Sequence, residues 1–296
     1  MTTPTHRPRT GVAYGLAAYL FWGFVPIYFK SVAHVAPTEV LAHRIIWSLI
    51  VMLLILTWRR RGQDLGLVFG DRRSLILLAG STTLVAINWY TFIWAVEHEQ
   101  LLQASLGYFI NPLVNVLLGF LFLGERLRQA QQVSVLLATT GVLFLTLQLG
   151  ELPAIALVLA FSFGTYGLIR KKIPVEAGAG LTIETMLLAP LALVYLVWLD
   201  TGDRLIFTHQ SRTTDLLLLA SGPVTALPLL WFAKAARRLR YATVGFLQYL
   251  APTMQFLLAV VIYGEVFSHS HLIAFGCIWT ALLVYSLDSW RGAGRT

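Results

Sequence analysis

Ionisable side chains occur inside long apolar stretches of this sequence, where they could bind or move a charged group. Glu39, His43 and Arg44 fall within six residues of one another, and Glu184 occurs at a comparable place later in the chain. A charge in such a stretch usually marks a ligand path or a functional pair, because an unpaired charge in apolar surroundings is costly. We predict gating or coupling roles for all four. A structural role is the alternative for Glu39, which lies near the end of its stretch, and for His43, a lone histidine.

Amide and small residues form two stripes with helical spacing. Because they recur every three to four residues, each stripe lies on one face of a helix. The first stripe comprises Ser105, Tyr108, Asn111, Asn115 and Gly119, and the second comprises Gly245, Gln248, Pro252, Gln255 and Ala259. An amide within a long apolar stretch must face protein or water to satisfy its hydrogen bonds. The stripes could therefore line a cavity or, alternatively, join neighbouring helices.

Aromatic residues are numerous near the stripes and could pack against the body of an amphiphilic or aromatic ligand. Tryptophan and tyrosine at segment ends are usually interface anchors, but Trp89 and Tyr90 fall near the middle of their segment. The predicted ligand-binding set is Asn88, Trp89, Tyr90, Tyr108, Asn111, Asn115, Trp231, Gln248, Tyr249 and Gln255.

The composition requires that a lipid bilayer surround the elements that carry these residues. Of the 296 residues, 57% are hydrophobic and 12% are charged, with a mean hydropathy of +0.72. Soluble chains carry about 25% charged residues, so this surface cannot all face water. The net charge of +8 does not indicate a nucleic-acid partner, because the basic residues are diluted in apolar sequence. Ten segments of roughly 20 residues are long enough to cross a bilayer as helices. They are 11–33, 38–58, 74–96, 103–123, 130–148, 152–170, 180–199, 215–236, 242–263 and 270–289.

The basic residues predict the orientation. If the ten segments alternate in direction, 18 of the 22 lysine and arginine residues fall on the side that holds both termini. Basic residues are retained in the cytoplasm, so both termini are predicted to be cytoplasmic.

The second half of the chain resembles the first. At an offset of 140 residues, Pro112 aligns with Pro252, and Gly124-Glu125 aligns with Gly264-Glu265. We expect structural roles for these six residues. We predict two five-helix repeats, at 1–150 and 151–296. Because five is odd, the second repeat enters the membrane from the opposite side, an arrangement that many transporters use around a midplane site.

The sequence contains none of the common catalytic signatures. It has no His-Glu-x-x-His, no phosphate-binding loop and no Gly-x-Ser-x-Gly. We expect no enzymatic activity, no metal and no cofactor, so that a gradient would drive transport. An intramembrane lipid-processing enzyme and a passive channel or sensory scaffold are the alternatives.

Several longer motifs resemble a known family. They are Asn88-Trp89 with Phe92-Ile-Trp-Ala-Val96, Ser105-Leu-Gly-Tyr-Phe-Ile-Asn-Pro-Leu-Val-Asn115, Gly124-Glu125-Arg126, Leu159-Ala-Phe-Ser-Phe-Gly164, Tyr166-Gly-Leu-Ile-Arg-Lys-Lys172 and Ile183-Glu-Thr185. From about Gly11 to Ser289, the chain resembles RarD-type permeases of the EamA family in the drug/metabolite transporter superfamily.

The resemblance implies a ten-helix permease of the bacterial inner membrane with two inverted halves. Spans 1, 3, 4, 6, 8 and 9 would line a central cavity for a small metabolite or drug-like solute, and the subfamily name is associated with chloramphenicol sensitivity. The expected partners are this solute and the lipid bilayer, and a homodimer is one assembly that the sequence leaves open. We therefore expect a secondary active transporter that works by alternating access.

Overall fold

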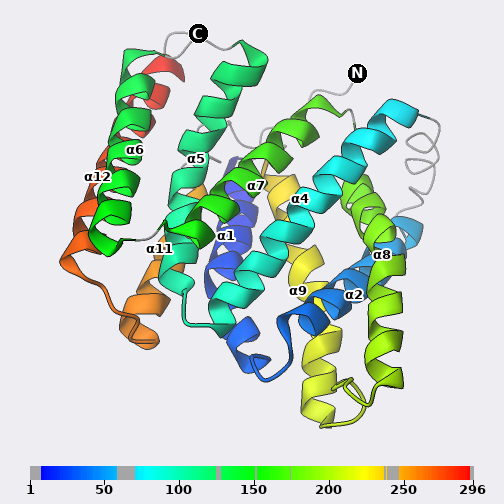
Figure 1. Cartoon of the computed structure of the whole chain (residues 1–296). Coiled ribbons are helices and arrows are strands. Elements are labelled where there is room, and N and C mark those ends of the chain that lie inside the picture. Colours follow the sequence, from blue (N-terminus) through cyan, green and yellow to red (C-terminus); the bar gives the residue numbers. More distant parts are fainter. Residues whose placement is uncertain are drawn as a thin grey trace.

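The computed structural model describes residues 8–58, 71–124, 128–150, 152–173, 175–236, 238 and 247–293. These residues form helices and their connections, with no β-strand among them (Figure 1). The α-helices are α1 (Pro8–Ser31), α2 (Pro37–Trp58), α4 (Arg72–Glu97), α5 (Leu101–Leu123), α6 (Gln129–Leu149), α7 (Ala154–Lys172), α8 (Ala177–Thr201), α9 (Arg212–Ala236), α11 (Leu250–Leu257) and α12 (His269–Ala293). A five-residue π-helix, η1 (Leu258–Ile262), directly follows α11.

The prediction of an all-α membrane protein is confirmed, and each helix coincides with one of the predicted segments. Among the described residues, eight helices are long and apolar enough to cross a membrane, whereas the apolar parts of α7 and of α11 with η1, Ala154–Arg170 and Leu250–Ile262, are shorter. Residues 242–246 of the predicted segment 242–263 lie outside the described residues, as does Gly245 of the second stripe. The π-turn of η1 was not predicted, since a widened turn leaves no mark on hydrophobic periodicity.

The outer surface of the bundle is apolar. Large aliphatic side chains such as Leu136, Leu147, Leu191 and Val261 are each more than 65% exposed. Apolar exposure on this scale would be unfavourable in water but suits a surface covered by acyl chains. The chain is therefore a multi-pass membrane protein.

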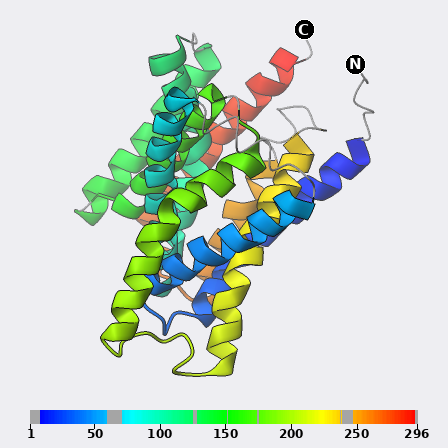
Figure 2. The same cartoon turned by 90° about the vertical axis from the view of Figure 1, so that its right-hand side faces the viewer.

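The closest helix pairs join the first half of the chain to the second. Helix α6 packs on α12 at one edge of the bundle, and α2 packs on both α8 and α9 (Figures 1 and 2). In addition, α1 packs on α9 and α11, α4 packs on α7 and α8, and α5 packs on α7 and α11. The two halves consequently share one interior instead of forming separate lobes.

Glycine residues allow two of these pairs to approach closely. A Cβ atom at Gly107 of α5 would lie 2.6 Å from the carbonyl oxygen of Ala156 in α7, and one at Gly222 of α9 would lie 2.5 Å from that of Trp47 in α2. Neither site has room for a side chain. Small residues at helix contacts let backbones come together where lipid supplies no hydrophobic drive for packing.

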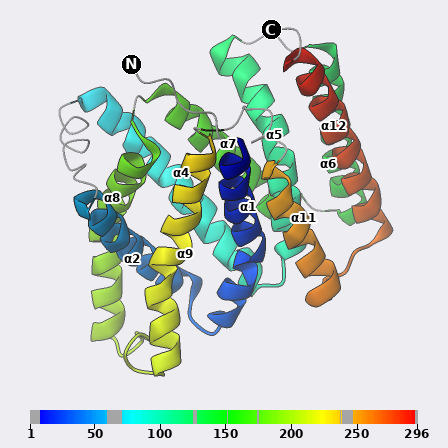
Figure 3. The same cartoon turned by 180° about the vertical axis from the view of Figure 1, so that it is seen from behind.

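The start of α1 and the end of α12 lie at the same end of the bundle (Figure 3), here called the terminal end. Helix α4 also begins there, with Asp71 as its N-cap. The Asp71 carboxylate accepts hydrogen bonds from the backbone N–H groups of Arg73 and Ser74, at 3.1 and 3.3 Å, and from the Ser74 hydroxyl at 2.5 Å. These hydrogen bonds, with that from the Ser74 hydroxyl foremost, lower the pKa of the exposed Asp71 carboxyl.

Candidate binding cavity

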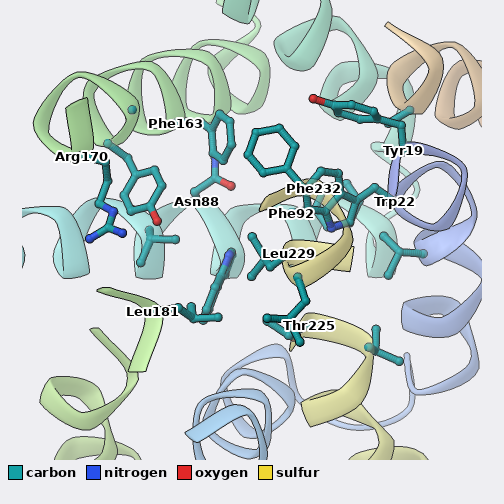
Figure 4. A pocket seen from close by; sticks show the side chains of 18 of the residues that line it. Tyr19, Trp22, Asn88, Phe92, Phe163, Arg170, Leu181, Thr225, Leu229 and Phe232 are labelled. Atoms are coloured by element: carbon teal, nitrogen blue, oxygen red, sulfur yellow. The ribbon is translucent and has the colours of Figure 1, made fainter. Parts of the chain in front are cut away.

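A cavity of about 940 Å³ lies within the bundle and is lined by residues from both halves of the chain. Helices α1, α4, α5, α7, α9 and α11, which correspond to the six spans expected to line it, all contribute. Helices α2 and α8 also contribute, which the resemblance did not imply. Figure 4 shows the Arg170 guanidinium at one side of the cavity and the aromatic side chains of Tyr19, Trp22 and Phe232 at the other.

Eight of the residues singled out in the sequence lie in the cavity lining; seven come from four different helices, and Gln248 lies just before α11. Their shared location means that intramembrane polarity helped to identify part of the cavity lining. They are Arg44, Asn88, Trp89, Tyr108, Asn111, Gln248, Pro252 and Gln255.

The buried amide of Asn88 joins three helices. Its Nδ2 donates to the carbonyl oxygen of Leu159 at 3.1 Å and to the hydroxyl of Ser162 at 3.0 Å, both on α7. Its Oδ1 accepts a 3.3 Å hydrogen bond from the hydroxyl of Tyr108 on α5. Similarly, Asn111 donates from Nδ2 to the carbonyl oxygen of Ala160 at 3.1 Å. Both amides therefore join helices while they line the cavity, so the two alternative roles coincide.

Arg44 is the cavity cation that is surrounded by aromatic rings. Its guanidinium carbon lies 4.2 Å from the ring centre of Trp89 and 5.5 Å from that of Phe29. Its Nε donates a 2.9 Å hydrogen bond to the Thr225 hydroxyl, which in turn donates to the carbonyl oxygen of Ser221 at 2.9 Å. Within the described part of the chain, Arg44 forms no ion pair with a carboxylate.

Gln255 supplies an unused acceptor. Its Nε2 donates to the carbonyl oxygen of Trp22 at 3.1 Å, whereas its buried Oε1 has no hydrogen-bond partner among the described residues. Buried polar atoms usually find partners, but this oxygen is enclosed by protein, so a ligand donor could reach it only if the surrounding side chains moved.

Glu184 lies immediately behind the cavity wall and is fully buried. It accepts hydrogen bonds from the hydroxyls of Ser81 at 2.7 Å and Tyr166 at 3.3 Å, and its Oε1 lies 3.9 Å from Nε of Arg170. Tyr166 and Arg170 line the cavity. The network joins α4, α7 and α8. A change in the charge of Glu184 would therefore alter the electrostatic environment of Tyr166 and Arg170 in the cavity lining.

Four members of the predicted ligand-binding set, Tyr90, Asn115, Trp231 and Tyr249, lie outside the lining. Tyr90 follows Trp89 by one residue, a rotation of about 100° on a helix, and is 36% exposed on the outer surface. Asn115 is exposed and donates from Nδ2 to Oδ1 of Asn111 at 3.1 Å. Trp231 contacts the ring of Phe21, and Tyr249 packs against the apolar core.

Glu39 and His43 lie away from the cavity, at the end of the bundle opposite the terminal end, here called the opposite end. Oε1 of Glu39 accepts hydrogen bonds from the backbone N–H groups of Ile206 at 2.9 Å and Phe207 at 3.2 Å, in the loop between α8 and α9. His43 accepts from Nε1 of Trp47 at 3.1 Å. Glu39 therefore ties α2 to this loop, and the His43 ring centre lies 4.7 Å from that of Phe207 in the same loop.

Glu265 makes an equivalent contact at the opposite end. Its two carboxylate oxygens accept from the backbone N–H groups of Leu101 at 2.8 Å and Leu102 at 2.7 Å, at the start of α5. A carboxylate suits a helix N-terminus, where backbone N–H groups lack helical partners. Burial nevertheless raises the pKa of the Glu265 carboxyl, and the two hydrogen bonds only partly offset this.

The remaining residues with expected structural roles occupy helix interiors and ends. Gly124 and Gly264 have left-handed backbone conformations, with φ of 66° and 68°. Gly124 ends α5 as its C-cap, and Pro112 is buried inside the same helix. Glu125 lies outside the described residues.

Several other lining residues were not predicted. Phe92 shares a helix face with Asn88 and Trp89 at a spacing of three to four residues, which could have revealed it. Arg170 counts among the basic residues that predict orientation and belongs to the family motif Tyr166–Lys172, but neither observation predicts a place in the cavity. Thr225 carries no local signal, since its role depends on Arg44, 181 residues earlier.

Apolar helices that enclose a cavity lined by polar and aromatic residues define a polytopic membrane protein with an internal cavity. Residues 9–147 match the EamA-like transporter family. The chain is 47% identical to Protein RarD of Escherichia coli and 48% identical to a protein of Pseudomonas aeruginosa named as a transporter, with 98% of both chains covered in each comparison. A crystal structure with 20% identity superposes with a TM-score of 0.61, covering 94% of this chain and 98% of the other, which supports the fold.

The chain belongs to the EamA family and, within it, to the RarD-type permeases. It is a membrane transporter and a multi-pass protein of the bacterial inner membrane.

Proposed function

We propose that this protein is a secondary active transporter that moves a small organic solute by alternating access. The observation that carries the proposal is that the cavity extends to the terminal end of the bundle but not to the opposite end. Its lining includes Val175 and Glu176, in the connection from α7 to α8, and Arg238 beyond α9. The connections at the opposite end contribute no lining residue among those described. With cytoplasmic termini, as the basic residues predict, the cavity faces the cytoplasm.

Contacts between separate segments close the opposite end. Besides those of Glu39 and Glu265, Nε2 of His34 lies 3.0 Å from the Thr214 hydroxyl, and Nζ of Lys30 lies 3.8 Å from Oε1 of Glu99. Alternating access requires that such contacts break while new ones form at the terminal end.

The helix pairing supports the two inverted repeats. If α1, α2, α4, α5 and α6 correspond in order to α7, α8, α9, α11 and α12, each of the closely packed pairs between the two halves has a counterpart. The pair α5–α7 becomes α11–α1, α2–α9 becomes α8–α4, and α1–α9 becomes α7–α4, while α2–α8 and α6–α12 map onto themselves. Two similar halves that exchange packing partners can form outward-facing and inward-facing states of comparable energy.

Uptake into proteoliposomes tests the transport proposal. Solutes that stabilise the purified protein in a thermal-shift screen would be supplied in radiolabelled form. We expect saturable uptake that responds to an imposed pH gradient. Covalent conversion of the solute would indicate an enzyme, and non-saturable flux would indicate a channel; either result would contradict the proposal.

A crosslink across the opposite end tests alternating access. In a Cys277→Ala background, His34→Cys and Thr214→Cys would be joined by a short bifunctional thiol reagent, since the native side chains touch. We expect uptake to stop on crosslinking and to return with a reducible reagent after reduction. Undiminished uptake by fully crosslinked protein would exclude opening at this place. Orientation is tested by single cysteines at Gly62 and Glu99, which should react with impermeant reagents from opposite faces.

A further inference from the structure

We infer that the solute is an aromatic carboxylate, whose carboxylate group binds Arg44 and whose ring packs on the aromatic side chains nearby. The inference rests on the proposed transport function and specifies the class of solute for that same cavity. Three features carry it: the free hydrogen-bond donors of Arg44, the charge of the cavity lining, and the rings that surround the guanidinium.

The Arg44 guanidinium is oriented by one hydrogen bond, but its remaining N–H donors have no acceptor in the described protein. Only Nε–H has a protein acceptor, the Thr225 hydroxyl, whereas Nη1 and Nη2 have none in the portion of the chain that the structure describes. Neither Nη atom is fully enclosed by protein, and the Arg44 side chain lines the cavity, so a ligand in the cavity can reach both atoms. A guanidinium with its terminal nitrogens free presents the paired N–H geometry that a carboxylate accepts in two parallel hydrogen bonds.

The charge of the described lining favours an anion. Four cations, Arg44, Arg170, Lys234 and Arg238, face the cavity against one carboxylate, that of Glu176. Arg170 is paired with Glu184, so its charge is partly neutralised. Lys234 and Arg238 lie over the ring of Tyr14, at 4.9 and 5.5 Å. A cleft lined mainly by one sign of charge concentrates ligands of the opposite sign.

The rings beside Arg44 suit an aromatic body. The Phe29 and Phe92 ring centres are 5.9 Å apart, and those of Phe92 and Tyr108 are 5.7 Å apart, both within range for aromatic contact. Trp89 covers one side of the guanidinium at 4.2 Å. The volume of about 940 Å³ accommodates a drug-sized molecule. An aromatic amine would instead bring a second positive charge to Arg44.

Binding to the wild-type protein tests the class without any mutation. Phenylacetate and indoleacetate would be compared with their neutral amides and with phenethylamine and tryptamine by calorimetric titration in detergent. We expect each carboxylate to bind roughly tenfold or more tightly than its amide, the size of a charge-assisted hydrogen bond, and the amines to bind most weakly. Equal affinities for acid and amide, preference for the amines, or failure of both carboxylates to bind would overturn the inference.

Variants then assign the effect to Arg44. Arg44→Gln should weaken phenylacetate binding by about 10- to 100-fold and leave phenylacetamide nearly unchanged, whereas Arg44→Lys should fall between. Arg204→Gln is the matched control, because Arg204 also lies on a tryptophan, 3.9 Å from the Trp198 ring centre, but outside the cavity. If Arg44→Gln weakens acid and amide equally, the residue acts through folding or cavity shape, and the proposed carboxylate contact is wrong.

Uptake measurements separate this inference from the proposed function. Carboxylate-selective binding without any flux would contradict transport and leave the binding assignment intact. Saturable uptake of neutral solutes with no preference for carboxylates would contradict the assignment and leave the transport proposal intact.

Discussion

Gly222 of α9 contacts the backbone of Trp47 in α2, three residues beyond Arg44. A Cβ atom at position 222 would lie 2.5 Å from the Trp47 carbonyl oxygen. Thr225 follows Gly222 by almost one helical turn and accepts the hydrogen bond from Arg44 Nε. The absence of a side chain at position 222 therefore sets the helix separation that brings the guanidinium within reach of its orienting hydroxyl.

We predict that Gly222→Ala destabilises the protein, because the added methyl group must push two backbones apart. Overpacking of this kind typically costs about 1–3 kcal/mol. Gly276→Ala in α12 is the control, since its Cβ would meet no atom within 4 Å and alanine favours a helix. Thermal unfolding in detergent should show a lower Tm for the first variant only. Equal Tm values for both would mean that the helices separate at no cost.

Asn88→Ala should cost about 1–3 kcal/mol, because it removes the two hydrogen bonds that the buried Asn88 amide donates to α7 and the acceptor of the Tyr108 hydroxyl. Asn115→Ala, on an exposed site with a single amide contact, should change stability by less than about 0.5 kcal/mol. Equilibrium unfolding of the two variants measures the difference. Comparable losses would mean that the Asn115 amide stabilises the protein as much as the buried Asn88 amide, which would contradict the prediction.

Glu184 and Arg170 should prove energetically coupled. Glu184→Gln or Arg170→Gln alone leaves an uncompensated charge in low-dielectric surroundings, for which about 3–5 kcal/mol is typical of a fully buried pair. Arg170 is partly exposed to the cavity, so we expect the lower part of this range. The double variant should be more stable than the sum of the two losses predicts. Strict additivity in the cycle would mean that the 3.9 Å pair contributes no net attraction.

Asp71 should make stability fall under acid conditions. Its pKa is lowered in the folded protein, so its contribution is fully present above the ordinary aspartate pKa and is lost as the pH falls through the folded value. Asp71→Asn keeps an N-capping acceptor but does not titrate. The Tm difference between wild type and variant should therefore shrink between about pH 5 and pH 2. A difference independent of pH would contradict the predicted titration.

The helices were predictable from sequence because the thickness of a bilayer fixes how long an apolar run must be. Which face of each helix turns inward was much harder to predict. Lipid and protein interior are both apolar, so Trp89 and Tyr90 look alike in sequence, although one lines the cavity and the other faces outward. Polar residues such as Asn88 and Asn111 were the better guides, since lipid tolerates them poorly.

The partners of the ionisable residues could not be predicted. Arg44 was identified from its depth, but Thr225 and Phe29 reach it only through tertiary packing. Glu39 was expected to act in gating, and its observed partners are the backbone amides of residues 206 and 207. Every residue except proline supplies such an amide, so no pattern in the sequence distinguishes them.

The hydrogen bonds of Glu39 and Glu265 with backbone N–H groups affect which substitutions the chain can tolerate at this end. Glu39 and Glu265 each hold a segment at the opposite end by accepting hydrogen bonds from its backbone N–H groups. Substitutions of Ile206 and Phe207 would preserve the hydrogen bonds to Glu39 unless they introduce proline, whereas Leu101 and Leu102 are also constrained by their burial in the apolar core. The two backbone contacts therefore depend on the carboxylates alone, whereas the contact of His34 with Thr214 at the same end depends on the side chains of both partners.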